Sequence, residues 1–393
     1  IYRTHDGGKT WTSITSGLPD GATINTVKED PKRKGLLFAG SETQVYVSLD
    51  DGGQWQSLRL NMPATSIRDL VIKDDDLVVG THGRGFWILD DITALRQLEP
   101  ATLDAEAYLF KPQTAIRFEW NRNTDTPLPP DEPAGQNPPD GAIIDYSLKQ
   151  PASGVATLEI LDSSGKLVRR YATDDQPVEL RDEGEVPAYW MRPSLILSGV
   201  PGLHRFVWDL HYPPAPGSPR IYPIAAAPHD TAPEPKGPWV LPGTYSVRLT
   251  VNGKSYMQPL VVRMDPRVKS GALALQQQFA LSKQLYDAVV AIQAAIPRVD
   301  AARDQARGSD NTDLVQKLGA LSGSEGGRGG FGGRGRDGAE GQPSLTSVSA
   351  QLSSLLALTQ DGSGPVPVQT AKAAEEALTR SQALLAQVKT LVR

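Results

Sequence analysis

The chain has 393 residues, a net charge of −5, five histidines and no cysteine. Without cysteine it can form neither disulfides nor thiolate metal sites, and its acidic balance gives no reason to expect nucleic acid as a partner. No apolar run of about 18 residues occurs, so the sequence predicts no membrane span.

A short pattern, Ser/Thr-x-Asp-x-Gly-x-x-Trp, occurs twice near the start of the chain, at 4–11 and 48–55. Its defining residues are Thr4, Asp6, Gly8 and Trp11 in the first copy and Ser48, Asp50, Gly52 and Trp55 in the second. A third, decayed copy keeps Asp90 and replaces the tryptophan with leucine. The Asp is expected to accept backbone N–H bonds inside a tight turn, while the Gly supplies a positive φ and the Trp covers the turn.

This pattern resembles the Asp-box, or BNR repeat, of sialidase-like and sortilin-like β-propellers. Spacings of 44 and 40 residues between Asp6, Asp50 and Asp90 match the length of one four-stranded blade. The resemblance implies that the boxes lie on the turn between the third and fourth strands, opposite the face that usually binds ligand. We therefore interpret the box residues as structural, in preference to a catalytic role for Asp6 or Asp50.

Residues 1–98 divide into blade strands, which amount to the last two and a half blades of a propeller. The expected strands are 24–28, 36–39, 45–48 and 55–58 in one blade, and 67–72, 77–80, 85–89 and 94–98 in the next. A propeller needs at least about four blades to close. We therefore expect the chain to be the C-terminal part of a longer protein.

Three polar residues are candidates for ligand binding. His82 and Arg84 lie in the turn between the second and third strands of their blade, and Glu42 lies in the equivalent turn one blade earlier. These turns are on the face opposite the Asp-boxes, and the three side chains suit contacts with carboxylates or sugar hydroxyls. The alternative is that glycines make a tight hairpin here and Arg84 only packs or pairs structurally. Asp90 and Asp91 do not suit an acid–base pair, because adjacent strand residues point to opposite faces.

Beyond residue 98 the pattern changes twice. Residues 99–140 are expected to form connecting strands, at 107–120, and a proline-rich linker at 121–140. Residues 141–266 are expected to form a small β-sandwich that includes a hairpin across Asn252-Gly253. The runs 202–210 and 241–247, the second beginning Leu-Pro-Gly-Thr-Tyr, resemble an immunoglobulin-like module of bacterial secreted proteins.

The last part, 267–393, is expected to be a small helical bundle. Amphipathic segments at 273–296, 345–358 and 368–392 would bury their Leu and Val stripes together. Between the first two lies a glycine-rich insert, 323–341, which we expect to be disordered. Its Arg-Gly-Gly run at 328–336 resembles an RNA-binding box, but a single short copy in an acidic chain indicates a flexible loop.

The fold class expected from the sequence is therefore mainly β with a helical tail: a partial BNR-type propeller, an Ig-like sandwich and an α-helical bundle. This order resembles large bacterial secreted proteins described as BNR-repeat, glycosyl-hydrolase-like or sortilin-N-terminal-like. The resemblance implies an extracellular or periplasmic protein, exported by an upstream signal peptide, that binds a glycan or peptide ligand and needs no cofactor or metal.

Two other functions stay open at this point. The chain could belong to a glycoside hydrolase, sialidase-like or xyloglucanase-like, whose catalytic carboxylates lie in upstream blades. It could also be a non-enzymatic scaffold whose helices recruit a partner. No catalytic residue is assigned from the sequence, and the seven-residue spacing of His204 and His211 is not a metal-binding spacing.

Overall fold

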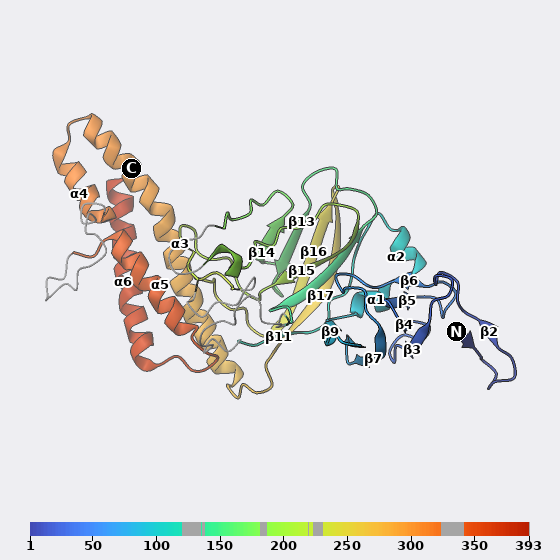
Figure 1. The fold of residues 1–393 in the computed structure, drawn as a ribbon. Coiled ribbons are helices and arrows are strands. Elements are labelled where there is room, and N and C mark those ends of the chain that lie inside the picture. The colour runs from blue at the N-terminus through green and yellow to red at the C-terminus, as the bar shows by residue number, and fades with distance from the viewer. Residues whose placement is uncertain are drawn as a thin grey trace.

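Three parts follow one another along the molecule in the computed structural model (Figure 1). The structure describes residues 1–119, 135, 138–180, 187–218, 220–222, 231–323 and 342–392. Small β-sheets lie at the end that carries the N-terminus, a sandwich lies in the middle, and a long helix leads to the helical part at the other end. Most of the predicted linker at 121–140, and the insert after Gly323, lie outside the described residues.

The N-terminal part consists of three antiparallel sheets whose strands follow one another in chain order. The strands are β1 (Tyr2–Arg3) and β2 (Thr12–Ser13), then β3 (Ile24–Glu29), β4 (Leu37–Ser41), β5 (Val45–Ser48) and β6 (Gln56–Ser57), then β7 (Ile67–Lys73), β8 (Asp76–Thr81) and β9 (Phe86–Leu89). The predicted strands at 24–28, 36–39, 45–48, 67–72, 77–80 and 85–89 are confirmed as strands. The prediction of an outer strand at 94–98 is wrong, because helix α1 (Thr93–Gln97) occupies this position.

The second and third sheets pack against each other through one apolar cluster. Phe38 of β4 and Leu70 of β7 are fully buried in it, together with Ile67. The two first strands, β3 and β7, also exchange polar contacts, because Thr26 donates a hydrogen bond to Asp69 at 3.2 Å. The sheets are therefore held by apolar packing inside and polar bonds at the rim.

Helix α1 is fixed by a buried ion pair. Arg96 Nε donates to Asp30 Oδ2 at 2.9 Å, and the Arg96 and Asp30 side chains are only 10% and 0% exposed. Arg96 also bonds the Asp75 carboxylate and the Asp74 carbonyl. One guanidinium on the helix thus joins the β3–β4 turn to the β7–β8 turn.

The middle part is a sandwich of two sheets. The smaller sheet has the order β10-β12-β15, and the larger has the order β11-β17-β16-β13-β14, in which β11 runs parallel to β17. The strands are β10 (Ala107–Leu109), β11 (Ala115–Arg117), β12 (Ala142–Leu148), β13 (Thr157–Leu161), β14 (Leu167–Ala172), β15 (Gly202–Trp208), β16 (Gly243–Val251) and β17 (Lys254–Met264). The strands within 107–120, expected to connect two domains, are thus part of the sandwich sheets, and the short helix α2 (Pro100–Asp104) precedes them.

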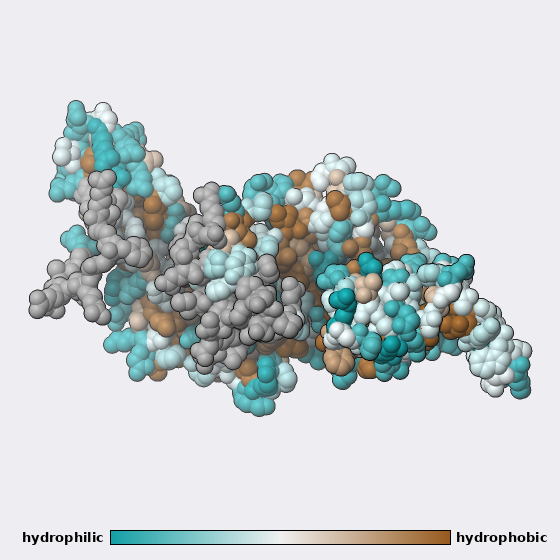
Figure 2. Space-filling view, viewed as in Figure 1, coloured by the Kyte–Doolittle hydropathy of each residue, from teal (hydrophilic) through white to brown (hydrophobic). Residues whose placement is uncertain are grey.

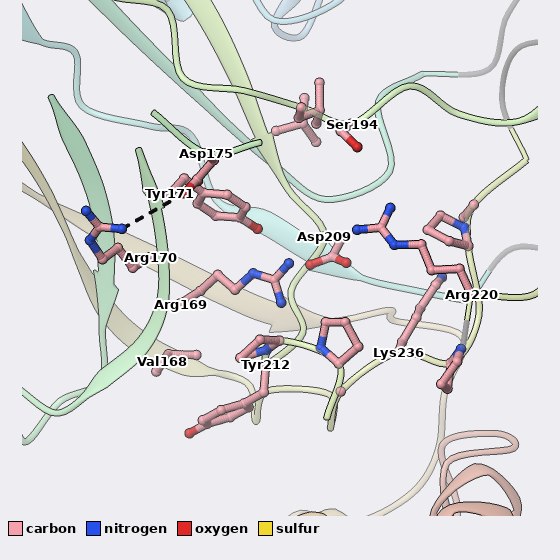
Figure 3. A pocket seen from close by; sticks show the side chains of 18 of the residues that line it. Val168, Arg169, Arg170, Tyr171, Asp175, Ser194, Asp209, Tyr212, Arg220 and Lys236 are labelled. Atoms are coloured by element: carbon pink, nitrogen blue, oxygen red, sulfur yellow. Dashed lines mark ion pairs between the residues drawn. The ribbon is translucent and has the colours of Figure 1, made fainter. Parts of the chain in front are cut away.

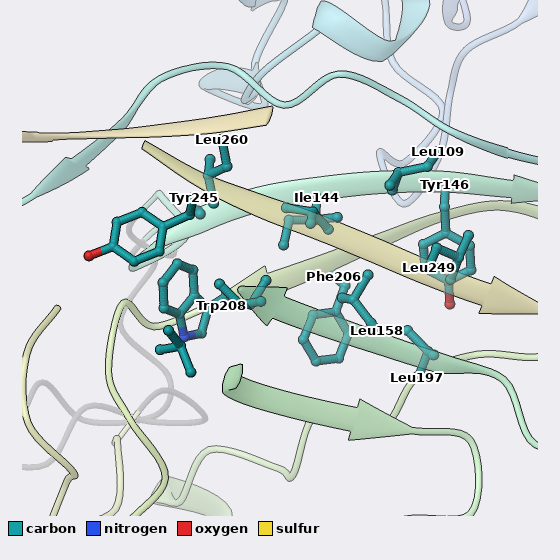
Figure 4. Close-up of a cluster of buried hydrophobic side chains, with 14 of the residues drawn as sticks. Leu109, Ile144, Tyr146, Leu158, Leu197, Phe206, Trp208, Tyr245, Leu249 and Leu260 are labelled. Carbon is teal, nitrogen blue, oxygen red and sulfur yellow. The ribbon is translucent and has the colours of Figure 1, made fainter. Parts of the chain in front are cut away.

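Large side chains from both sheets fill the sandwich core (Figure 4). Trp208 of β15 is fully buried, and its indole N–H donates to the His211 carbonyl at 3.0 Å. Phe206 lies on the same face of this strand, as its alternation with Trp208 predicts. The hairpin between β16 and β17 turns at Asn252 and Gly253, with φ of 51° and 75°, and so confirms the predicted turn.

Arg205 joins the sandwich to the N-terminal part. Its guanidinium pairs with Asp145 of β12 at 2.9 Å and donates to the carbonyls of Asp90 and Asp91 at 2.5 and 2.6 Å. Phe110, which follows β10, is buried against Ala94 and Leu98 at the same junction. Helix α1 therefore contacts both neighbouring parts.

The described residues of the C-terminal part form four helices around one apolar core. They are α3 (Ala272–Gly308), α4 (Thr312–Ser322), α5 (Leu345–Thr359) and α6 (Val368–Leu391). The predicted helices at 345–358 and 368–392 are confirmed, but α4 was not foreseen and α3 continues past its predicted end at residue 296. It passes through Pro297 because buried side chains on both sides, Ile292 and Val299, hold it in the core. Leu273, expected in the buried stripe, is 67% exposed.

We predict that Arg96→Leu lowers the free energy of unfolding by about 3 to 5 kcal/mol, because it leaves the buried Asp30 carboxylate without its charged partner. The measurement is urea unfolding followed by tryptophan fluorescence. Lys254→Ala is the control, because it breaks an exposed pair with Glu106 and should cost no more than about 1 kcal/mol. Equal losses in the two variants would contradict the role given to Arg96.

Candidate functional site

Two turns at one edge of the N-terminal sheets carry the residues expected to bind ligand. The turn between β4 and β5 holds Glu42, and the turn between β8 and β9 holds His82. Each residue donates its backbone N–H to the segment that leads into its sheet, Glu42 to Thr23 at 3.2 Å and His82 to Ser66 at 2.9 Å. The two turns are therefore bonded in the same way in successive sheets.

The Glu42 carboxylate is the centre of a polar group at this edge. It accepts a hydrogen bond from Asn25 Nδ2 at 2.9 Å and from Arg68 Nη1 at 3.4 Å. The neighbouring Ser66 hydroxyl and the Asn25 amide lower the pKa of Glu42, and the charges of Arg68 and His82 add to this effect. Glu42 is thus an ionised acceptor beside a cation, an arrangement that can bind hydroxyl, amide or carboxylate groups.

Arg84 lies in the same turn as His82, as expected from the sequence. Its backbone N–H donates to the Thr81 hydroxyl at 3.1 Å, and its carbonyl accepts from the Trp87 indole at 3.1 Å. Among the described residues, no hydrogen bond or ion pair to its side chain is found. The structure thus places Glu42 and His82 in equivalent turns, where the His82 charge lowers the pKa of Glu42, and the main chain of Arg84 bonds within the turn of His82.

Asn25 and Arg68 belong to the same edge and were missed from the sequence. Each is the second residue of a strand, β3 or β7, that was correctly expected. Asn25 also donates to the Ile67 carbonyl at 3.0 Å, so its amide spans the two sheets. The sequence did carry a signal for both residues, because in each of two successive inner strands a polar residue directly follows the first apolar residue.

The first Asp-box forms the turn expected for it. Asp6 Oδ1 accepts from the Thr4 hydroxyl at 2.8 Å and from the Thr10 N–H at 2.9 Å, and the Gly8 N–H donates to Thr4 at 2.9 Å. The hydrogen bonds from the Thr10 N–H, the Thr10 hydroxyl and the Thr4 hydroxyl lower the pKa of Asp6 to about 2. The Thr4 and Asp6 side chains are thus both used in hydrogen bonds within the turn.

The second box repeats these bonds. Asp50 Oδ1 accepts from the Ser48 hydroxyl at 2.8 Å and from the Gln54 N–H at 2.9 Å, and the Gly52 N–H donates to Ser48 at 2.9 Å. The flanking strands repeat as well, because Tyr2 pairs with Ser13 and Tyr46 pairs with Ser57. Asp6 and Asp50 therefore stand on equivalent turns.

The two box tryptophans have different surroundings. Trp55 is 1% exposed, and its indole N–H donates to the Ile14 carbonyl at 2.9 Å, so the ring lies against the segment that follows β2. Trp11 is 61% exposed and donates to Gly8 within its own turn at 3.1 Å. The tryptophan thus joins successive repeats only where a neighbouring segment packs on it.

The third copy does not repeat the turn. After Asp90 the chain enters helix α1, and the Asp91 carboxylate accepts the N–H of Thr93 at 2.9 Å. The Asp91 N–H in turn donates to Asp76 at 2.9 Å. Burial raises the pKa of Asp90, and the nearby Asp76 charge adds to this effect. The Asp91 and Asp76 carboxylates thus bond the backbone at the start of the helix, where the N-terminal part meets the sandwich.

The described residues contain no group of three His, Asp or Glu side chains that could hold a metal ion. Within the same ranges, no helix has the length and apolar character needed to cross a membrane.

Comparisons with known proteins add little. No protein-family model matches the chain, and neither does any curated protein. Among solved structures, the chain is similar to the extracellular domain of a putative one-component system from B. thetaiotaomicron, with 10% sequence identity and a TM-score of 0.19. The match covers 68% of this chain and 28% of the other. A TM-score this low carries no argument about fold or function.

Substitution of Trp55, compared with substitution of Trp11, tests whether Trp55 joins the two repeats. Trp55→Ala should lower the free energy of unfolding by about 3 to 5 kcal/mol, because it opens a cavity between two segments. Trp11→Ala should change it by no more than about 0.5 kcal/mol, because the ring is exposed. The measurement is urea unfolding of both variants, followed by far-UV circular dichroism. Similar losses in both would mean that Trp55 does not join the repeats.

Proposed function

We propose that this chain is part of a BNR-type β-propeller protein of the sortilin-N-terminal-like or glycosyl-hydrolase-like kind, exported from the cell. The support is the pair of Asp-box turns with the same hydrogen bonds and the same strand register, spaced by 44 residues. The side-by-side position of β3 and β7, each the first strand of its sheet, is also typical of neighbouring blades. The sandwich would then be an Ig-like accessory module.

The function proposed is binding of an extracellular glycan or peptide at the edge that holds Glu42 and His82. The single observation that carries it is the convergence of Glu42, Asn25 and Arg68, from three strands and turns, on one exposed spot. An ionised carboxylate accepts hydroxyl or amide N–H groups, and an adjacent guanidinium donates to oxygen atoms. Both ligand classes offer such groups.

Binding is favoured over hydrolysis by the state of Glu42. A glycosidase acid must hold its proton near neutral pH, which requires a raised pKa. The hydrogen bonds and positive charges around Glu42 lower its pKa instead. Glu42 therefore does not suit the general acid of a glycosidase, and the hydrolase alternative needs that acid elsewhere.

The test is a screen of the purified chain on glycan and peptide arrays, followed by titration calorimetry of the ligand found. Arg68→Gln should weaken binding about tenfold, because it removes a charge-assisted hydrogen bond. Lys73→Gln is the matched control, since Lys73 lies at the other end of the same strand and pairs with Asp74. Equal binding by both variants, or no ligand on either array, would contradict the proposal.

A further inference from the structure

A large cavity lies in the middle part of the molecule, and its described lining does not include Glu42. It has a volume of about 740 Å³ and lies between β14, the end of β15, the segments 192–196 and 232–237, and helix α3. Figure 3 shows the side chains of Arg169 and Asp209 pointing toward each other, and Tyr212 is also part of the lining. A cavity of this size can hold a small organic ligand.

Positive charge gathers around this cavity although the whole chain is acidic. Its described lining contains seven lysine and arginine side chains but only two carboxylates, Asp175 and Asp209. The chain as a whole carries a net charge of −5. In a partly enclosed space such a cluster attracts anions.

Some of this charge is balanced within the protein. Arg170 pairs with Asp175 at 4.0 Å, the contact drawn as a dashed line in Figure 3. Lys283 pairs with Asp287, four residues further along α3, at 2.5 Å. Lys236 lies on the opposite side of the cavity and forms no ion pair with another described residue. Even without Arg192, the cations Lys166, Arg169, Arg220 and Lys236 outnumber Asp209, the one carboxylate of the described lining that remains.

Arg169 gives the second, independent observation. Its Nη1 atom is buried, and among the described residues it has no hydrogen-bond partner. The guanidinium lies over the Tyr171 ring, 5.1 Å from its centroid. A buried donor without a partner costs free energy, and Arg169 lines the cavity, so its guanidinium keeps a donor that the described part of the protein does not use.

The other lining groups indicate what kind of anion fits. Asp209 lies among the cations with about a third of its side chain exposed, and it can accept hydroxyl donors. Ser194 offers a hydroxyl group, and Tyr212 offers an aromatic ring. Inorganic phosphate is far smaller than the cavity, and it has few protons to offer to a carboxylate.

We propose that this cavity binds an acidic saccharide, a hydroxylated ring that carries a carboxylate. The carboxylate contacts Arg169 and Lys236, ring hydroxyl groups donate to Asp209, and the ring face packs near Tyr212. This inference is independent of the proposed function, because it concerns other residues in another part of the chain.

The test is titration calorimetry of the whole chain with trigalacturonic acid, its methyl ester and inorganic phosphate. The acid should bind at least about tenfold more tightly than the ester, which has the same rings without the charge. Raising the salt concentration should weaken its binding, because the contacts are between charges. Equal binding of acid and ester, or no binding of the acid, would overturn the proposal. Phosphate binding as tightly as the acid would overturn the assignment to a saccharide.

Variants locate the site. Lys236→Gln and Arg169→Gln should each weaken binding of the acid about tenfold, whereas Arg263→Gln, an exposed cation of β17 that does not line the cavity, should leave it unchanged. Arg169 is partly buried, so near-UV circular dichroism must first show that its variant is folded, and Lys236→Gln tests the site without this concern. If neither cavity variant weakens binding, or if Arg263→Gln weakens it equally, the cavity is not the site.

Discussion

The pair formed by Arg96 and Asp30 is the interaction on which the N-terminal part depends. An ion pair so deeply buried is stable only when further hydrogen bonds satisfy its remaining atoms. Here the other Asp30 oxygen accepts the N–H groups of Lys32 and Arg33. Arg96 uses its remaining donors on Asp74 and Asp75. The position of helix α1 is thereby tied to two sheets at once.

The position of helix α1 also affects how the N-terminal part contacts the sandwich. Helix α1 stands where the outer strand of a third box-bearing repeat would lie, and its start presents the carbonyls of Asp90 and Asp91 to Arg205. The repeating sheets therefore end at a helix that is bonded to the next part. On the face shown in Figure 2, the end of the molecule that carries the N-terminus is mostly hydrophilic. The edge that holds Glu42 lies in the N-terminal part, whereas the cationic cavity lies in the middle part.

Local patterns in the sequence predicted most strands and the Asn252-Gly253 hairpin, because alternation and turn residues act over a few neighbours. Residues 94–98 were misassigned because a short apolar run fits either a strand or a helix, and the buried pair of Arg96 with Asp30 decides between them. The placement of Glu42 and His82 in equivalent turns could be predicted because these turns share a position in the repeat. The cavity was missed because Arg169, Asp209 and Lys236 come from separate segments that only the folded chain brings together.

The central claim is that the edge with Glu42 and His82 binds the extracellular ligand. Amide hydrogen exchange of the chain, with and without a ligand found on the arrays, tests this claim most directly. We expect slower exchange at 41–45 and 81–86 in the presence of ligand, and unchanged exchange at the turns 4–11 and 48–55 on the opposite edge. Ligand binding that leaves 41–45 and 81–86 unchanged would contradict it.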